Sequence, residues 1–254
     1  MKYLTLALLT VLMFSCNNET KKTKTENLSA NEIIDKSIEV SGGECFANSD
    51  IGFDFRDKTY ASKRQGGKYL LLRVTVEENN DSIFDILSNE SFERFINDEV
   101  IKLEDSIAKK YAASVNSVHY FSVLPYGLNS SSVNKTLLGE EQIKSKDYYK
   151  IKVTFKEEGG GEDYQDVFIY WIDRDDFKVQ YLAYSYNEVD GKGMRFREVY
   201  NERYKNGLRF VDYNNYKAES DALELSELGR AFENNQLELI SKIQLKNVTV
   251  NLLN

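Results

Sequence analysis

The sequence is poor in the residues that most enzyme active sites and metal centres use. Its 254 residues include one proline, two cysteines and a single histidine, His119. A zinc site built from pairs of histidine or cysteine ligands is therefore excluded. A Walker-type phosphate loop is absent too, because the glycine run at 159–161 is followed by two acidic residues that would repel a phosphate. We predict no cofactor.

The charge balance and the aromatic content exclude two further classes of protein. The chain has 33 basic and 41 acidic side chains, a net charge of −8, so it lacks the basic face that nucleic-acid binding requires. Aromatic residues make up 13% of the chain, which excludes a wholly disordered protein. One large β domain and two small domains are both compatible with this length.

The N-terminus has the layout of an export signal. Lys2 is followed by an apolar run over residues 3–14 that is too short for a permanent membrane span, and then by Ser15 and Cys16. The segment 13–16 resembles the lipobox of bacterial lipoproteins, which implies that residues 1–15 are a signal peptide and that Cys16 is lipidated. The alternative is a soluble secreted protein with a free Cys16.

Residues 16–29 are predicted to be a lipid-anchored flexible tether, because the stretch after Cys16 is polar except for Leu28. No acidic cluster follows the cysteine, so the resemblance to lipoprotein sorting signals implies the periplasmic face of the outer membrane. With Cys16 lipidated, Cys45 has no partner for an intramolecular disulfide. Cys45 is then either a small buried residue or a reactive loop thiol, and we favour burial because its close sequence neighbours include no basic residue.

The rest of the chain reads as two helices and a long series of hairpins. Ser29 and Glu32 form a capping box that predicts a helix over 30–40, and apolar spacing predicts a second helix over 104–123. Asn206 and Gly207 predict a two-residue hairpin turn. A short helix is predicted over 222–232. Strands are predicted over 51–56, 68–77, 82–88, 99–103, 136–143, 148–156, 166–173, 178–186, 193–205, 208–216 and 237–252.

Sequential hairpins without intervening helices predict an α+β fold that is mainly antiparallel β, with residues 30–254 as one domain. Counting residues across the two turns between 166 and 205 places Trp171 opposite Gln180 and Tyr184 opposite Phe196. This register gives one continuous apolar face, which the two long helices would cover. We predict that this face lines a ligand cavity; the alternative is a filled core. Its residues are Val167, Ile169, Trp171, Leu182, Tyr184, Tyr186, Met194 and Phe196.

Five short signatures carry a resemblance to a family. They are Ser41-Gly42-Gly43, Phe53-Asp54-Phe55-Arg56, Leu124-Pro125, Tyr170-Trp171 and Arg195-Phe196-Arg197. Together with the predicted layout they resemble uncharacterised outer-membrane lipoproteins of Gram-negative bacteria with a LolA/LolB-like fold. The resemblance implies a single large curved sheet, a half-open β-barrel, with helices covering its concave face. In that superfamily the concave side holds acyl chains, which implies a lipid-binding cavity here. No loop typical of a carrier or a receptor is visible.

The sequence leaves three functions open. The first is an outer-membrane lipoprotein that binds a lipid or another apolar ligand without catalysis, with the membrane as its partner through the N-terminal lipid. The second is a structural or interaction module of the envelope with a filled core. The third is a hydrolase with two converging carboxylates. Because the chain has 41 acidic residues, the sequence does not indicate which two would form such a pair. We interpret His119 as a satisfied boundary residue rather than a catalytic base, and the acidic turns near 173–176 and 187–191 as turns rather than calcium loops.

Overall fold

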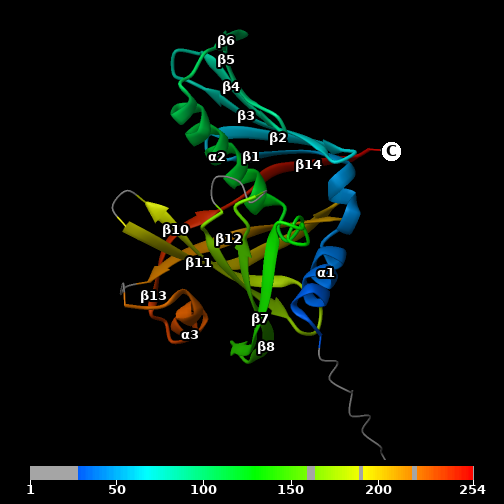
Figure 1. Cartoon of the computed structure of the whole chain (residues 1–254), viewed down its shortest axis with the longest axis vertical. Coiled ribbons are helices and arrows are strands. Elements are labelled where there is room, and N and C mark those ends of the chain that lie inside the picture. Colours follow the sequence, from blue (N-terminus) through cyan, green and yellow to red (C-terminus); the bar gives the residue numbers. More distant parts are fainter. Residues whose placement is uncertain (1–27, 159–163, 189–190, 219–221, 254) are drawn as a thin grey trace, which may run out of the picture.

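The computed structural model describes residues 28–158, 164–188, 191–218 and 222–253 (Figure 1). The predicted signal peptide, Cys16 and the tether up to residue 27 lie outside the described residues. So do the predicted glycine turn at 159–161 and residues 189 and 190 of the predicted acidic turn at 187–191. Within the described ranges, no helix is long and apolar enough to cross a membrane.

Two antiparallel sheets, each with seven strands, make up most of the described chain. The first has the order β14-β1-β2-β3-β4-β5-β6 and the second the order β13-β12-β11-β10-β9-β8-β7. The strands of the first sheet are β1 (Ser49–Phe55), β2 (Lys58–Gln65), β3 (Lys68–Val76), β4 (Ser82–Ser88), β5 (Phe92–Ile96), β6 (Glu99–Ile101) and β14 (Lys246–Leu252). Those of the second are β7 (Val133–Ile143), β8 (Lys146–Phe155), β9 (Val167–Asp173), β10 (Val179–Glu188), β11 (Gly191–Lys205), β12 (Leu208–Ala218) and β13 (Leu237–Ile243).

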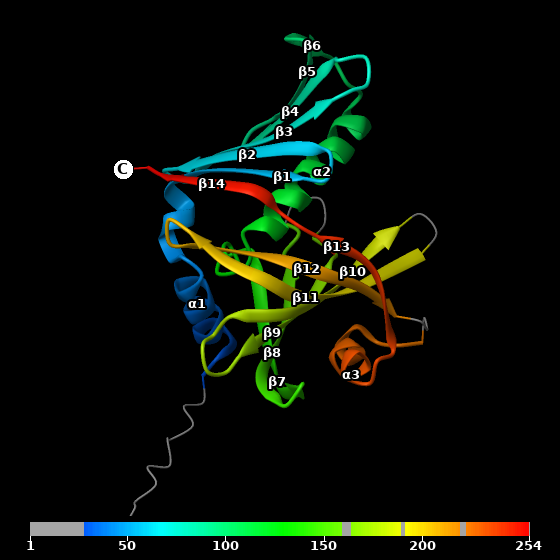
Figure 2. The ribbon, with the colours of Figure 1, turned by 180° about the vertical axis from the view of Figure 1, so that it is seen from behind.

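A short connection near the C-terminal end of the chain joins an edge strand of one sheet to an edge strand of the other. Only Gln244 and Leu245 separate β13 at the edge of the second sheet from β14 at the edge of the first, and Figure 2 shows this segment passing from one sheet to the other. The predicted α+β, mainly antiparallel fold is confirmed. Hydrogen bonding divides the predicted curved sheet into two, and the strand predicted over 237–252 is shared between them.

The predicted helices are present. They are α1 (Ala30–Val40), α2 (Asp105–Ser122) and α3 (Leu228–Glu233), together with the 3₁₀ helices η1 (Gly43–Asn48) and η2 (Leu225–Glu227). The capping box of α1 is confirmed, because the Ser29 hydroxyl accepts from the Glu32 backbone and the Glu32 carboxylate accepts from the Ser29 backbone. Asn206 and Gly207 both have positive φ angles, 47° and 81°, as a two-residue hairpin turn requires.

The strands β2 and β5 are not among the predicted elements. The inward positions of β2 include Ser62 and Arg64, both of which are buried. Since a buried face is expected to be apolar, this strand gives no alternating signal. The short strand β5 carries an aromatic residue on each face, which obscures the alternation there as well.

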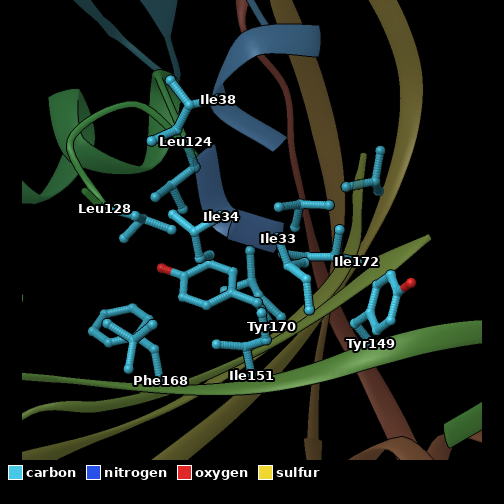
Figure 3. Packing of buried hydrophobic residues seen from close by; sticks show 14 of the residues in the cluster. Ile33, Ile34, Ile38, Leu124, Leu128, Tyr149, Ile151, Phe168, Tyr170 and Ile172 are labelled. Carbon is cyan, nitrogen blue, oxygen red and sulfur yellow. The ribbon is translucent and has the colours of Figure 1, made fainter. Parts of the chain in front are cut away.

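Helices cover both faces of the second sheet. On one face, Ile33, Ile34 and Ile38 of α1 pack against aromatic and aliphatic residues of β8 and β9 (Figure 3). On the opposite face, Leu228 of α3 is buried in a cluster with Trp171. Gly229 allows this close approach, because a Cβ at this position would lie 2.7 Å from the Trp171 ring. The prediction that the two long helices cover the face that carries Trp171 was therefore wrong, because α3 covers it and α1 packs on the other face.

The structure also corrects the predicted register of β10. The predicted register holds where Val179 pairs with Ile172, but a β-bulge follows, and Trp171 pairs with Tyr181 instead of Gln180. The pairing of β10 with β11 is likewise one residue away from the prediction. Because successive side chains of a strand point to opposite faces, this slip reverses the predicted orientation of the β10 residues. These residues are Leu182, Tyr184 and Tyr186.

Candidate functional site

The residues predicted to line one cavity are divided between the two faces of the second sheet, so the prediction of a single continuous face was wrong. Five of them lie on the face that α3 covers, where Trp171 and Phe196 are fully buried. These five are Val167, Ile169, Trp171, Met194 and Phe196. The three β10 residues lie on the opposite face, and only Tyr184 among the eight lines the pocket described next.

A pocket of about 390 Å³ lies between the C-terminal half of α2 and the junction of the two sheets. Figure 1 shows α2 extending from the first sheet toward the second. The walls combine aliphatic, aromatic and polar side chains from α2, from the end of β1 and from β10 to β13. They are Phe55, Arg56, Ser117, Val118, Phe121, Ser122, Tyr184, Arg195, Arg197, Val211, Tyr213, Asn215, Ile240, Ser241, Ile243 and Leu245.

Arg197 is the central polar residue of this pocket. It is 8% exposed, and its guanidinium lies 3.8 Å from the centre of the Phe121 ring. Its Nη2 donates a hydrogen bond of 2.8 Å to the Tyr184 hydroxyl, whereas its Nε is buried without a partner. Burial raises the pKa of the neighbouring Tyr213 hydroxyl. The pocket therefore holds a charged donor group within an aromatic wall.

The register of β11 explains how Arg197 reaches this position. Arg195 and Arg197 are two residues apart and therefore share one face of the strand. The cross-strand neighbours of Arg197 are Leu182 on β10 and Asn215 on β12, neither of which can neutralise it. Asn215 donates to the Ser241 hydroxyl at 3.1 Å, but its Oδ1 is buried without a donor.

The pocket is strongly cationic in a chain that is acidic overall. Three of its described lining residues are arginines, Arg56, Arg195 and Arg197, and none is aspartate or glutamate. By contrast, the larger hollows of about 630 and 570 Å³ beside β3 and β4 are bordered by exposed residues such as Asn89 and Glu90. The pocket at the sheet junction is therefore the best candidate for a functional site.

Sequence reasoning gave Arg195 and Arg197 no role beyond their place in one of the five signatures. The predicted cavity face was assigned from a register that the β10 bulge invalidates. The available signal was the pair of arginines at strand spacing on either side of Phe196, since a strand that buries Arg197 and half-buries Arg195 needs a reason to do so.

His119 is not a boundary residue, as the sequence suggested, but a core residue beneath β3. It is 1% exposed, and its Nε2 lies 3.0 Å from the Leu72 carbonyl oxygen, to which it donates. Burial is the main cause that lowers the pKa of His119 to about 4. The aromatic rings of Phe53 and Tyr60 pack edge-on against the imidazole. The imidazole is therefore a neutral part of the core.

Cys45 is exposed in η1, and the expectation that it is buried was wrong. The next residue, Phe46, takes the inward position of this short helix and is fully buried. Elsewhere in the described ranges, no group of three or more histidine, cysteine or acidic side chains could hold a metal ion. In the acidic turn at 173–176, Asp173 accepts from the Asp175 backbone, which is a turn interaction.

Solved structures with a similar chain path include a protein of the LolA superfamily, as the sequence signatures led us to expect. A LolA superfamily protein from Nitrosomonas europaea is 13% identical, with a TM-score of 0.45, and the match covers 89% of this chain and 94% of that chain. A domain from Vibrio parahaemolyticus described as outer-membrane lipoprotein-sorting is 8% identical, with a TM-score of 0.42, covering 80% of this chain and 97% of that one. A DUF1329 family protein from Desulfovibrio piger is 9% identical, with a TM-score of 0.38, and the match covers 87% of this chain and 92% of that chain.

The sequence was also compared with curated proteins and with family models. No curated protein matches this chain. The model of a family of unknown function, DUF6503, matches residues 2–245, which extend from the predicted signal peptide to the residue before β14. The match spans nearly the whole chain, and the protein therefore belongs to the DUF6503 family.

Proposed function

We propose that this protein is a lipid-anchored protein of the bacterial cell envelope that binds a lipid or another apolar ligand, without catalysis, in the pocket between α2 and the two sheets. The observation that carries the proposal is a pocket of about 390 Å³ that side chains leave unfilled at the junction of three structural elements. This volume falls within the range of about 300–1,000 Å³ that is typical of small-molecule sites.

The apolar part of the pocket supports binding of a hydrocarbon chain. Val118 and Phe121 of α2 face Val211, Ile243 and Leu245 of the second sheet and its connection to the first. Removing apolar ligand surface from water against such walls stabilises a complex by about 25 cal/mol per Å². A wall formed by a helix on one side and sheets on the other can also admit a ligand by a small displacement of the helix.

Native mass spectrometry of the protein extracted from cells tests this proposal. We expect a co-purifying lipid-sized adduct on the wild-type protein. The substitution Val118→Trp adds an indole to the pocket wall and should remove the adduct. The matched control Val100→Trp changes the same residue type on β6, where the side chain is 69% exposed, and should retain it. Absence of any adduct from the wild-type protein would contradict the proposal.

The envelope location rests on the predicted anchor. Under the proposal, residues 1–15 are the signal peptide, residues 16–29 tether the lipidated Cys16 to the folded part, and residues 30–254 form one half-barrel domain in the periplasm. Labelling cells with an alkyne fatty acid tests the anchor. Cys16→Ser should abolish the label, whereas Cys45→Ser, which removes the exposed second cysteine, should not. Continued labelling of the Cys16 variant would refute attachment at this residue.

A further inference from the structure

The polar half of the pocket indicates what kind of head group a ligand presents. Building on the proposed function, we infer that the pocket binds an anionic amphiphile with one apolar chain, and that Arg197 binds its carboxylate or phosphate group. The inference rests on the charge, the burial and the unused donors of the residues around Arg197.

Arg197 is a buried cation whose hydrogen-bonding capacity is largely unused. A guanidinium has five N–H donors and keeps its charge at all physiological pH values. The structure gives Arg197 one hydrogen bond, to the neutral Tyr184 hydroxyl, and leaves Nε without an acceptor. Buried charges in proteins are normally paired, because removing an unpaired charge from water is costly. An anion in the pocket would supply the missing acceptor oxygens.

The aromatic contacts hold the guanidinium in place without neutralising it. Its centre lies 3.8 Å from the Phe121 ring, 4.9 Å from the Tyr184 ring and 5.7 Å from the Tyr213 ring. Stacked aromatic rings orient a guanidinium without using its in-plane N–H donors. Arg197 is therefore positioned in advance for bidentate binding of a carboxylate or phosphate.

The surroundings reinforce the preference for an anion. In the described part of the chain, no carboxylate lies within ion-pair distance of Arg195 or Arg197, although most of the buried or half-buried arginines elsewhere, such as Arg73 and Arg209, have one. The polar residues that α2 contributes to the pocket wall are Ser117 and Ser122, neither of which carries a charge. Among the described residues, Arg195 and Arg197 thus have no acidic partner, although the chain has a net charge of −8.

A second unsatisfied atom and the pocket size narrow the class of ligand. The buried Oδ1 of Asn215 lacks a donor, and a phosphate monoester or a hydroxyl-bearing head group could provide an O–H for it. The volume of about 390 Å³ lies near the lower end of the usual range for ligand sites, which favours one acyl chain over a lipid with several.

Photo-crosslinking of the full-length protein in cell membranes tests the inference. The probe is dodecanoic acid that carries a diazirine and a terminal alkyne, and the matched probe is the corresponding alcohol. Labelled peptides are mapped by mass spectrometry. Because hydrogen bonds to charged groups contribute about 1.5–3 kcal/mol, the acid should label the pocket at least about tenfold more than the alcohol at equal concentration.

Variants assign this preference to Arg197. Arg197→Met, which keeps the length of the side chain, should reduce acid labelling to the level of the alcohol and leave alcohol labelling intact. Arg230→Met, the same change at an exposed site of α3 on the other side of the sheet, should keep the wild-type preference. If Arg197→Met does not fold by circular dichroism, the wild-type comparison of the two probes still decides whether the pocket prefers an anion.

Competition distinguishes the sources of the anion. Unlabelled dodecanoate and dodecyl phosphate should both displace the acid probe, whereas inorganic phosphate at the same concentration should not, because it lacks the chain. Displacement by inorganic phosphate would overturn the assignment to an amphiphile. Equal pocket labelling by the acid and the alcohol would overturn the anion inference and leave the proposed function standing. Pocket labelling by neither probe would overturn the proposed function itself.

Discussion

His119 should make the stability of this protein depend on pH in a range that one substitution can isolate. The unfolded chain takes up a proton on this histidine as the pH falls below its ordinary pKa of 6.5, whereas the folded protein holds the ring neutral down to a pKa of about 4. Between these values the unfolded state binds more protons, so the free energy of unfolding decreases as the pH falls.

The magnitude follows from the two pKa values. Between pH 7.5 and pH 5 the histidine alone should lower the free energy of unfolding by about 2 kcal/mol, and the remaining loss occurs as the pH approaches 4. Carboxylates with a lowered pKa, such as Asp54 and Glu202, change the free energy of unfolding at lower pH than His119 does. His119 is the only histidine in the chain, so no other imidazole contributes.

Urea unfolding at several pH values provides the measurement. Trp171 is the only tryptophan and is fully buried, which makes its fluorescence a suitable probe. The reference is His119→Gln, whose side-chain amide can still donate to the Leu72 carbonyl but does not titrate. The decrease in unfolding free energy between pH 7.5 and pH 5 should be about 2 kcal/mol smaller in this variant. An equal decrease in both proteins would refute the assignment of a neutral buried His119.

Three further substitutions test the packing of the two sheets. Trp171→Ala should lower the free energy of unfolding by about 3–5 kcal/mol. Pocket labelling by the acid probe should stay unchanged, because Trp171 lies on the opposite face of the sheet. Reduced labelling of the folded variant would contradict this. Asp85→Ala removes the carboxylate that Arg73 and Arg94 contact at 2.6 and 2.7 Å. Urea unfolding should therefore show a decrease of about 3–5 kcal/mol in the free energy of unfolding. A decrease near zero would be inconsistent with the ion-pair geometry. Gly229→Ala would gain about 1 kcal/mol from helix propensity but places a Cβ 2.7 Å from the Trp171 ring, so we expect a net loss in the melting temperature rather than a gain.

Local sequence signals predicted much of the fold because local chemistry determines the elements concerned. The capping box at Ser29 and Glu32 and the Asn206-Gly207 turn specify their structures through neighbouring residues alone. The mainly antiparallel class followed from the sequence of hairpins. Strand β2 could not be recognised, because the burial of Arg64 depends on contacts made by distant parts of the chain.

The candidate site was harder to predict because it depends on register. A single bulge after Val179 determines which side of the sheet Tyr184 faces, and no turn residue in the sequence specifies that bulge. The position of Arg197 beneath Phe121 of α2 depends further on where the helix crosses the junction of the sheets. Both are properties of tertiary packing, which a single sequence does not reveal.

The segment that joins β13 to β14 has a consequence for the order in which the molecule can fold. Ser49 at the start of β1 pairs with Leu252 at the end of β14. The first strand of the chain therefore cannot complete its pairing until the last strand is in place. Pairings between such distant residues slow folding, because the loop must close before its contacts form. Strand β13 forms the edge of the second sheet next to β12. A chain truncated before residue 237 would therefore expose an unpaired edge on both sheets at once, a state prone to aggregation.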